Sequence, residues 1–222
     1  MELLLRVEGV LVLVTLFLVF RIWHVIIPKR MKVSSSSYFK SNFHQVNADR
    51  GKNRQQIRVM AVLGSGGHTT ELLKLMKRLH RDIYTPVTFV IAETDKTSQT
   101  KTELDWKPKD CDSFAFIPRS REVEFMIIIL NGILTMWLIS RRPQLVLCNG
   151  PGTCIPICIA VVLFRVLGIH TDSKIIFCES FARVQHLSLT GKMLYYVADE
   201  FVVQWPQLQV KYPRTKHLGV IC

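Results

Sequence analysis

The chain has 222 residues, a formal net charge of +12 and 49% apolar residues. This length accommodates one ordinary domain with an extension or two small domains, and the apolar content is sufficient for a sizeable core. Nucleic acid is the usual partner of so basic a chain, but the sequence contains no nucleic-acid-reading module or aromatic platform, so we exclude that class of function.

The amino-terminal segment predicts a membrane anchor. The apolar run Val7–Ile27 has 21 residues, which at about 1.5 Å per residue spans a hydrocarbon layer of roughly 30 Å. A cleavable signal peptide is the alternative, but Lys29, Arg30 and Lys32 follow the run and no small-x-small cleavage site is present. We therefore assign residues 1–28 as a transmembrane anchor with a luminal amino terminus and a cytosolic remainder.

Residues 29–56 predict a solvated basic linker. The stretch Pro28–Arg58 has a net charge of +7, contains four consecutive serines and shows no apolar periodicity. Because this charge lies next to an anchor, we attribute it to attraction by anionic membrane lipids.

From Ile57 onward, short apolar runs alternate with runs of helical periodicity. The expected strands are Ile57–Leu63, Val87–Ala92, Ser113–Ile117, Gln144–Cys148, Lys174–Cys178, Glu200–Trp205 and Lys216–Ile221. The expected helices are Thr70–Arg81, Ser98–Trp106, Cys154–Leu167 and Thr190–Ala198. This alternation predicts a Rossmann-like α/β domain over residues 57–222, with a parallel sheet, helices on both faces and right-handed crossovers.

Glu124–Ser140 predicts one further helix, which is apolar on nearly all sides but short for a membrane span. Two interpretations stay open. The helix is either buried in the core or dips into the membrane, with Arg141 and Arg142 at lipid phosphates.

We expect neither a metal nor a cofactor. The six cysteines form no Cys-x-x-Cys pair, and the seven histidines show no ligand spacing with them. Most of the cysteines lie in apolar runs of a domain assigned to the cytosol, so free thiols are expected.

The turn Gly64-Ser65-Gly66-Gly67-His68-Thr69 joins the first strand to the following helix. Glycine lets the backbone approach a ligand closely, and the free N–H groups at a helix start favour a phosphate oxygen. The turn lacks the sixth glycine of the dinucleotide fingerprint, where Thr69 stands, and the lysine of the ATP-binding loop. A diphosphate site is one interpretation, and a tight turn that only lets helix and strand pack is the other.

Three more polar or flexible segments follow predicted strands: the turn at Glu93, the second glycine turn Asn149–Thr153, and Glu179–Val184. Ligands bind parallel sheets at the carboxyl ends of the strands. We therefore expect these segments and the first glycine turn to line one crevice.

Five motifs together resemble a known family. They are Gly64–Glu71, Asn149–Thr153, Glu179–Val184, Leu187–Lys192 and Gln204–Pro206. From Ile57 to its carboxyl terminus, the chain resembles the asparagine-linked glycosylation protein fourteen family, the membrane-anchoring subunit of the dolichol-linked UDP-N-acetylglucosamine transferase. More distantly, the two glycine turns are similar to those of the bacterial lipid II-forming glycosyltransferase.

The resemblance implies the acceptor-side half of a two-domain (GT-B) glycosyltransferase. A separate soluble chain, of the asparagine-linked glycosylation protein thirteen family, would bind UDP-N-acetylglucosamine and be held by Tyr212–Cys222, although an ordinary edge strand also explains that segment. The length agrees, because 222 residues minus the 56 before Ile57 leaves 166, enough for one Rossmann-like domain. The implied reaction adds the second N-acetylglucosamine to N-acetylglucosaminyl-diphospho-dolichol on the cytosolic face of the endoplasmic reticulum.

For this inverting displacement, His68 is the expected base and Glu179 is the second candidate. The helix dipole disfavours an imidazolium at position 68, which leaves a ring able to accept a proton. The alternative for His68 is a helix cap, and the alternative for Glu179 and Arg183 is a structural ion pair. The residues expected at the acceptor diphosphate are Gly64, Ser65, Gly66, Gly67, Thr69, Asn149, Gly150, Gly152, Thr153 and Arg183.

Two other classes of function stay open. One is a membrane adaptor without a catalytic contribution. The other is a membrane-anchored nucleotide-dependent oxidoreductase, against which the threonine at position 69 argues.

Overall fold

The computed structural model describes residues 12, 15–17, 19–25, 56–118, 142–169 and 171–219. The predicted anchor, most of the basic linker and the predicted helix Glu124–Ser140 therefore lie largely or wholly outside the described residues. Residues 19–25 are helical. Within the described ranges, no helix has both the length and the apolar composition that crossing a membrane requires.

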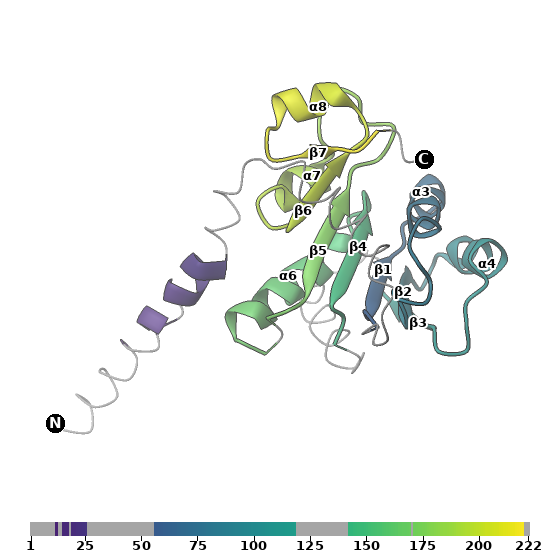
Figure 1. Cartoon of the computed structure of the whole chain (residues 1–222), viewed down its shortest axis with the longest axis horizontal. Coiled ribbons are helices and arrows are strands. Elements are labelled where there is room, and N and C mark those ends of the chain that lie inside the picture. Colours follow the sequence, from purple (N-terminus) through teal and green to yellow (C-terminus); the bar gives the residue numbers. More distant parts are fainter. Residues whose placement is uncertain are drawn as a thin grey trace, which may run out of the picture.

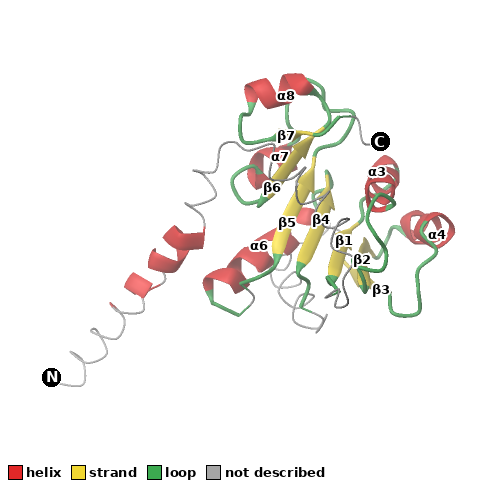
Figure 2. Cartoon of the chain, in the orientation of Figure 1, coloured by secondary structure: helices red, strands yellow, loops and turns green. Residues whose placement is uncertain are grey.

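The described domain is built on one sheet of seven parallel strands in the order β3-β2-β1-β4-β5-β6-β7 (Figures 1 and 2). The strands are β1 Val59–Val62, β2 Val87–Ala92, β3 Ser113–Ile117, β4 Leu145–Asn149, β5 Lys174–Cys178, β6 Glu200–Val203 and β7 Lys216–His217. This confirms the predicted α/β fold, and the order is that of a Rossmann-like sheet with one strand added at an edge.

Helices cover both faces of the sheet, as Figure 1 shows. They are α3 Gly67–Met76, α4 Lys96–Asp105, α6 Cys154–Val166, α7 Leu189–Leu194 and α8 Pro206–Lys211. Alternate residues of β1 point to opposite sides: Val59 and Ala61 pack in the core under α3, and Met60 and Val62 in the core under α6. Burial on both faces explains why these strands are apolar throughout their length.

Three elements near the carboxyl terminus differ from the sequence prediction. β6 ends at Val203, and the chain then enters α8, which we did not predict. Pro206 occupies the first helical position, where its fixed φ is favourable and its missing N–H costs nothing. The closing strand is only Lys216–His217, and residues 220–222 lie outside the described part.

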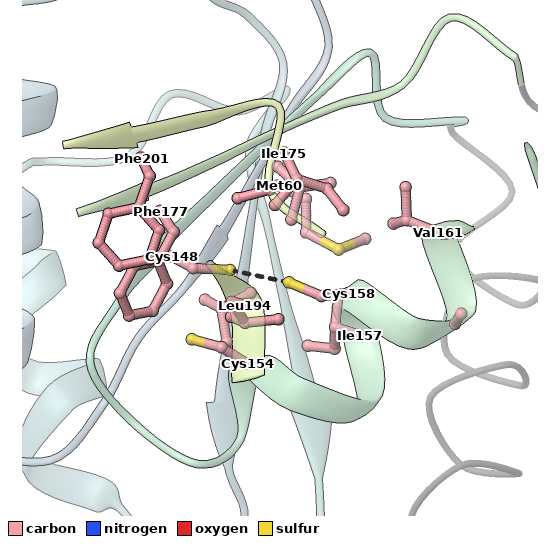
Figure 3. Close-up of a cluster of buried hydrophobic side chains, with 14 of the residues drawn as sticks. Met60, Cys148, Cys154, Ile157, Cys158, Val161, Ile175, Phe177, Leu194 and Phe201 are labelled. Atoms are coloured by element: carbon pink, nitrogen blue, oxygen red, sulfur yellow. Dashed lines mark hydrogen bonds between the residues drawn. The ribbon is translucent and has the colours of Figure 1, made fainter. Parts of the chain in front are cut away.

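Buried thiols fill part of the core under α6 (Figure 3). The sulfur atoms of Cys148 and Cys158 lie 3.7 Å apart without a disulfide, and all five described cysteines are free, as predicted. The contact with the Cys148 thiol, followed by burial, raises the pKa of Cys158 well above its ordinary value. These thiols therefore stay neutral and act as small apolar side chains.

One buried ion pair joins α6 to the strands beside it. Arg165 is 5% exposed, and its guanidinium pairs with Asp199 and donates to the carbonyl oxygen of Ser173. Asp199 also accepts the N–H of Ile175, at 2.7 Å, where β5 begins. The carboxylate of Asp199 thus holds the end of α6 against the starts of β5 and β6.

We expect Asp199→Ala to lower the free energy of unfolding by about 3–5 kcal/mol, because it leaves the Arg165 charge buried without its partner. Denaturant unfolding of the full chain, followed by tryptophan fluorescence, measures this loss. The control is Asp82→Ala, which removes an exposed pair with Lys109 and should cost less than about 1 kcal/mol. Equal losses in the two variants would contradict a structural role for the buried pair.

Candidate functional site

The first glycine turn presents an open helix start. Gly66 is the N-cap of α3, with φ at 64°, and no side chain caps the helix. No acidic residue lies in the first turn of α3, and Ser65, Gly66 and Gly67 are exposed. The free N–H groups and the dipole at this end are therefore suited to an anion such as a diphosphate.

The two glycine turns interlock at the carboxyl ends of β1 and β4. A Cβ on Gly64 would lie 2.7 Å from Cγ of Pro151, and a Cβ on Gly150 would lie 2.5 Å from Cε1 of His68. Gly150 also has a φ of +69°, which side chains rarely adopt. These turns meet where the strand order reverses, the position at which sheets of this type bind ligands.

A hydrogen-bonded network surrounds the half-buried ring of His68. Nδ1 of His68 lies 3.0 Å from Oδ1 of Asn149, whose side chain is 1% exposed. Nδ2 of Asn149 donates to Oε2 of Glu71 at 3.0 Å, and Oγ of Ser180 donates to Oε1 of Glu71 at 3.0 Å. Among the described residues, none hydrogen-bonds Nε2 of His68. The structure thus brings together the predicted residues His68 and Asn149.

Glu71 is a residue of this network that we did not place in the site. It lies three positions after His68 on α3, and residues so spaced share one face of a helix. That spacing was the signal that could have found it.

Thr69 lies beneath the first turn, although we predicted it at the diphosphate. Its side chain is fully buried and its hydroxyl donates to the carbonyl oxygen of Gly64. Its Oγ1 is also 2.7 Å from Oγ of Ser98, which donates to Oδ2 of Asp95 at 2.7 Å. The geometry therefore gives Thr69 a supporting position under the turn.

The residues of the second glycine turn that we expected at the diphosphate are not all exposed. Gly152 is exposed and Gly150 is half-buried, whereas Thr153 is 8% exposed. Within the described part of the chain, the hydroxyl oxygen of Thr153 is buried and has no hydrogen-bond partner. Its place in a ligand site stays a prediction.

Glu179 is linked to the His68 network through Ser180, whose hydroxyl donates to Glu71. Its fully buried carboxylate accepts the N–H of Ser180 at 3.1 Å and the N–H of Ser188 at 2.9 Å, and it packs on Gly191. Burial raises the pKa of the Glu179 carboxyl, while the hydrogen bonds from Ser188 and Ser180 and the charge of Arg183 oppose that rise. Arg183 is exposed. The Glu179 carboxylate therefore fixes the backbone of residues 180–191. Its catalytic role stays a prediction.

The segment after β5 is also fixed from two other sides. The rings of Phe181 and Trp205 lie 5.0 Å apart, and Nε1 of Trp205 donates to the carbonyl oxygen of Phe181 at 2.7 Å. The N–H of Phe181 donates to Glu71 at 3.3 Å. The motifs around Glu179 and Trp205 are therefore joined by hydrogen bonds to the helix that starts at the first glycine turn.

Metal ligands are not gathered here: in the described part of the chain, no three His, Cys, Asp or Glu side chains form a group that could hold a metal ion. The polar groups present suit proton transfer and anion binding.

A parallel sheet with its glycine turns at the strand-order reversal defines the class as a Rossmann-like α/β domain. The model of the family "Oligosaccharide biosynthesis protein Alg14 like" matches residues 59–221, and the chain belongs to that family. A human protein named UDP-N-acetylglucosamine transferase subunit ALG14 is 39% identical over 224 residues, covering 94% of each chain. The mouse protein of the same name is 42% identical over 185 residues, covering 76% of this chain and 84% of its own.

One solved structure is also similar. The crystal structure of MurG from Acinetobacter baumannii aligns with a TM-score of 0.49 and 21% identity, over 68% of this chain and 41% of that one.

We expect Gly150→Ala to destabilise the domain and displace the ring of His68. The unfavourable positive φ alone costs about 1–2 kcal/mol, and the new methyl group would overlap the imidazole. Denaturant unfolding and the NMR signals of the His68 ring measure both effects. Gly67→Ala is the control, because a Cβ there meets nothing within 4 Å; it should be neutral or gain up to about 1 kcal/mol. An undisturbed His68 ring in Gly150→Ala would contradict the interlock.

Proposed function

We propose that the chain is the membrane-anchoring, acceptor-binding subunit of a two-chain UDP-N-acetylglucosamine transferase. Its similarity to proteins named as a subunit of that transferase runs through 94% of both chains for the human relative. The complex adds the second N-acetylglucosamine to N-acetylglucosaminyl-diphospho-dolichol at the cytosolic face of the endoplasmic reticulum. The donor-binding half belongs to a soluble chain of the asparagine-linked glycosylation protein thirteen family.

The observation that carries the catalytic part is the position of His68. Its ring stands at the open start of α3, and Nδ1 is held by Asn149. In the proposed reaction Nε2 takes the proton of the acceptor hydroxyl, the oxygen attacks the anomeric carbon of the donor sugar, and UDP leaves. The N–H groups of Gly66 and Gly67 bind the acceptor diphosphate at the same helix start.

The need for a second chain follows from size. One parallel sheet occupies the described domain, and the 166 residues from Ile57 onward suffice for one Rossmann-like unit but not two. A GT-B site requires two such units that face each other. The outer edge of β7 is a natural place for a partner to dock, so we assign docking to Tyr212–Cys222.

The membrane anchor is supported by residues 19–25, which are helical and carry exposed apolar side chains, including Phe20 and Trp23. Arg21 of this helix donates to the carbonyl oxygens of Arg165, at 2.6 Å, and Val166, at 3.0 Å, at the end of α6. A cation at a helix carboxyl end is favourable. We therefore propose an anchor over residues 1–28, a linker over 29–56 and a half domain over 57–222.

Reconstitution tests the proposed complex. The purified full chain should transfer no sugar from UDP-N-acetylglucosamine to a diphospho-polyprenol acceptor, and adding the soluble donor-binding chain should start the reaction. Deleting residues 216–222, which removes β7 and the residues after it, should abolish co-purification of that chain. Transfer by a preparation that mass spectrometry shows to be free of any second chain would contradict the division of labour. Undiminished recruitment by the truncated chain would contradict the docking assignment.

His68→Ala should reduce transfer by about 100-fold or more while the complex still assembles, because the variant lacks the base. The initial rate at saturating donor and acceptor measures this loss. His80→Ala is the control, since that histidine is exposed and lies outside the site. Normal turnover by the His68 variant would favour the alternative of an adaptor with no catalytic contribution.

A further inference from the structure

Glu71 is the acceptor at the centre of the polar network, although the proposed reaction does not use it directly. The groups that donate to its carboxylate include Nδ2 of Asn149 at 3.0 Å, Oγ of Ser180 at 3.0 Å and the N–H of Phe181 at 3.3 Å. These donors come from β4 and from the segment after β5, whereas Glu71 lies on α3. One carboxylate thus joins α3, the end of β4 and the segment after β5.

The carboxylate determines the direction of the neighbouring hydrogen bonds. Because a carboxylate accepts and does not donate, the amide group of Asn149 that faces Glu71 must be its NH₂ group. Oδ1 of Asn149 therefore faces Nδ1 of His68, at 3.0 Å. An amide oxygen can only accept, so Nδ1 carries the ring proton and Nε2 keeps its lone pair.

Burial makes this direction costly to reverse. Asn149 is 1% exposed, so water does not satisfy a reversed amide. A reversed amide would also point its NH₂ group at His68 and its oxygen at the Glu71 carboxylate, where two acceptors would face each other without a proton.

We propose that Glu71 is a positioning residue that acts through the amide of Asn149 to hold His68 in the Nδ1–H tautomer, with Nε2 free to accept a proton. This proposal rests on the proposed function in one respect only, namely that the proton accepted by Nε2 comes from the acceptor hydroxyl. The alternative is that Glu71 merely secures the segment after β5 through Ser180 and Phe181.

Nitrogen NMR of the full chain, labelled with ¹⁵N at histidine, tests the tautomer without any activity measurement. The spectra are recorded at about pH 8.5, roughly two units above the ordinary imidazole pKa. The wild-type ring should be in the Nδ1–H form. Glu71→Ala frees the amide of Asn149 to reverse, so the Nε2–H form should appear.

Glu71→Gln should keep the Nδ1–H form. Its amide oxygen can still accept from Asn149 and Phe181, while its NH₂ group faces the Ser180 hydroxyl, which can accept. A role based on charge alone would instead be lost in this variant. Glu103→Ala, which removes an exposed carboxylate from α4, is the control and should leave the His68 signals unchanged.

A second substitution distinguishes a Glu71 that positions His68 from a Glu71 that only secures the segment after β5. Asn149→Asp presents an oxygen to Nδ1 of His68 in either orientation, so adding it to Glu71→Ala should restore the Nδ1–H form. A merely structural role would not be restored, because Ser180 and Phe181 would still lack their acceptor.

Transfer assays of the reconstituted complex complete the test. Glu71→Ala should lower kcat by about tenfold or more, because a base in the wrong tautomer cannot accept the proton, and KM for the acceptor should change little. The double variant should recover most of the rate. A wild-type ring in the Nε2–H form, an unchanged tautomer in Glu71→Ala, or no restoration in the double variant would each overturn the proposal. Tautomer changes as expected with unaltered transfer would support the positioning role and overturn only the assignment of His68 as the base.

Discussion

The contact between the two glycine turns is the constraint on which the site depends. β1 and β4 pair with Val62 opposite Cys148, so the turns that follow them emerge side by side. A Cβ at Gly64 or Gly150 would lie 2.7 or 2.5 Å from atoms of the other turn, well inside the separation of packed carbon atoms. Glycine at these positions is therefore a packing requirement. This close contact brings the starts of α3 and α6 together where the strand order reverses. It also packs the ring of His68 against the backbone of the second turn.

Hydrogen bonds then fix the first glycine turn and the ring of His68 in this position. Above the turn, the amide of Asn149 uses its oxygen toward His68 and its NH₂ group toward Glu71, so neither end is left unpaired in a buried position. Below the turn, Thr69 donates to the carbonyl oxygen of Gly64, and Oγ1 of Thr69 lies 2.7 Å from Oγ of Ser98, which donates to Asp95. Hydrogen bonds on two sides thus fix the turn, and breaking them would leave buried polar groups unpaired. The ring of His68 is therefore oriented before any ligand binds.

The sequence was sufficient for the seven strands and for the described helices other than α8. β2, β3 and β5 begin and end at the predicted residues, because each is a short, largely apolar run bounded by proline or polar residues. It was not sufficient for the direction of side chains. Thr69 and Glu179 were expected to face a ligand, and both are buried, because hydroxyl and carboxyl groups next to exposed turns can equally bond the backbone that forms those turns. Glu71 was passed over because its role depends on Asn149, which is distant along the chain.

Helix α6 connects the site to the proposed anchor. It begins directly after the second glycine turn, and its last carbonyl oxygens accept hydrogen bonds from Arg21. Its 13 residues span about 20 Å, so the Arg21 contacts and the second glycine turn are about that far apart. The α6 side chains that are not buried are all apolar: Ile155, Ile159, Val162 and Leu163. Of these four, Leu163 is 37% exposed, and Val162 packs against the core under α6. The proposed anchor and the ring of His68 therefore contact opposite ends of the same helix or of the turn that precedes it, which fixes the distance between them.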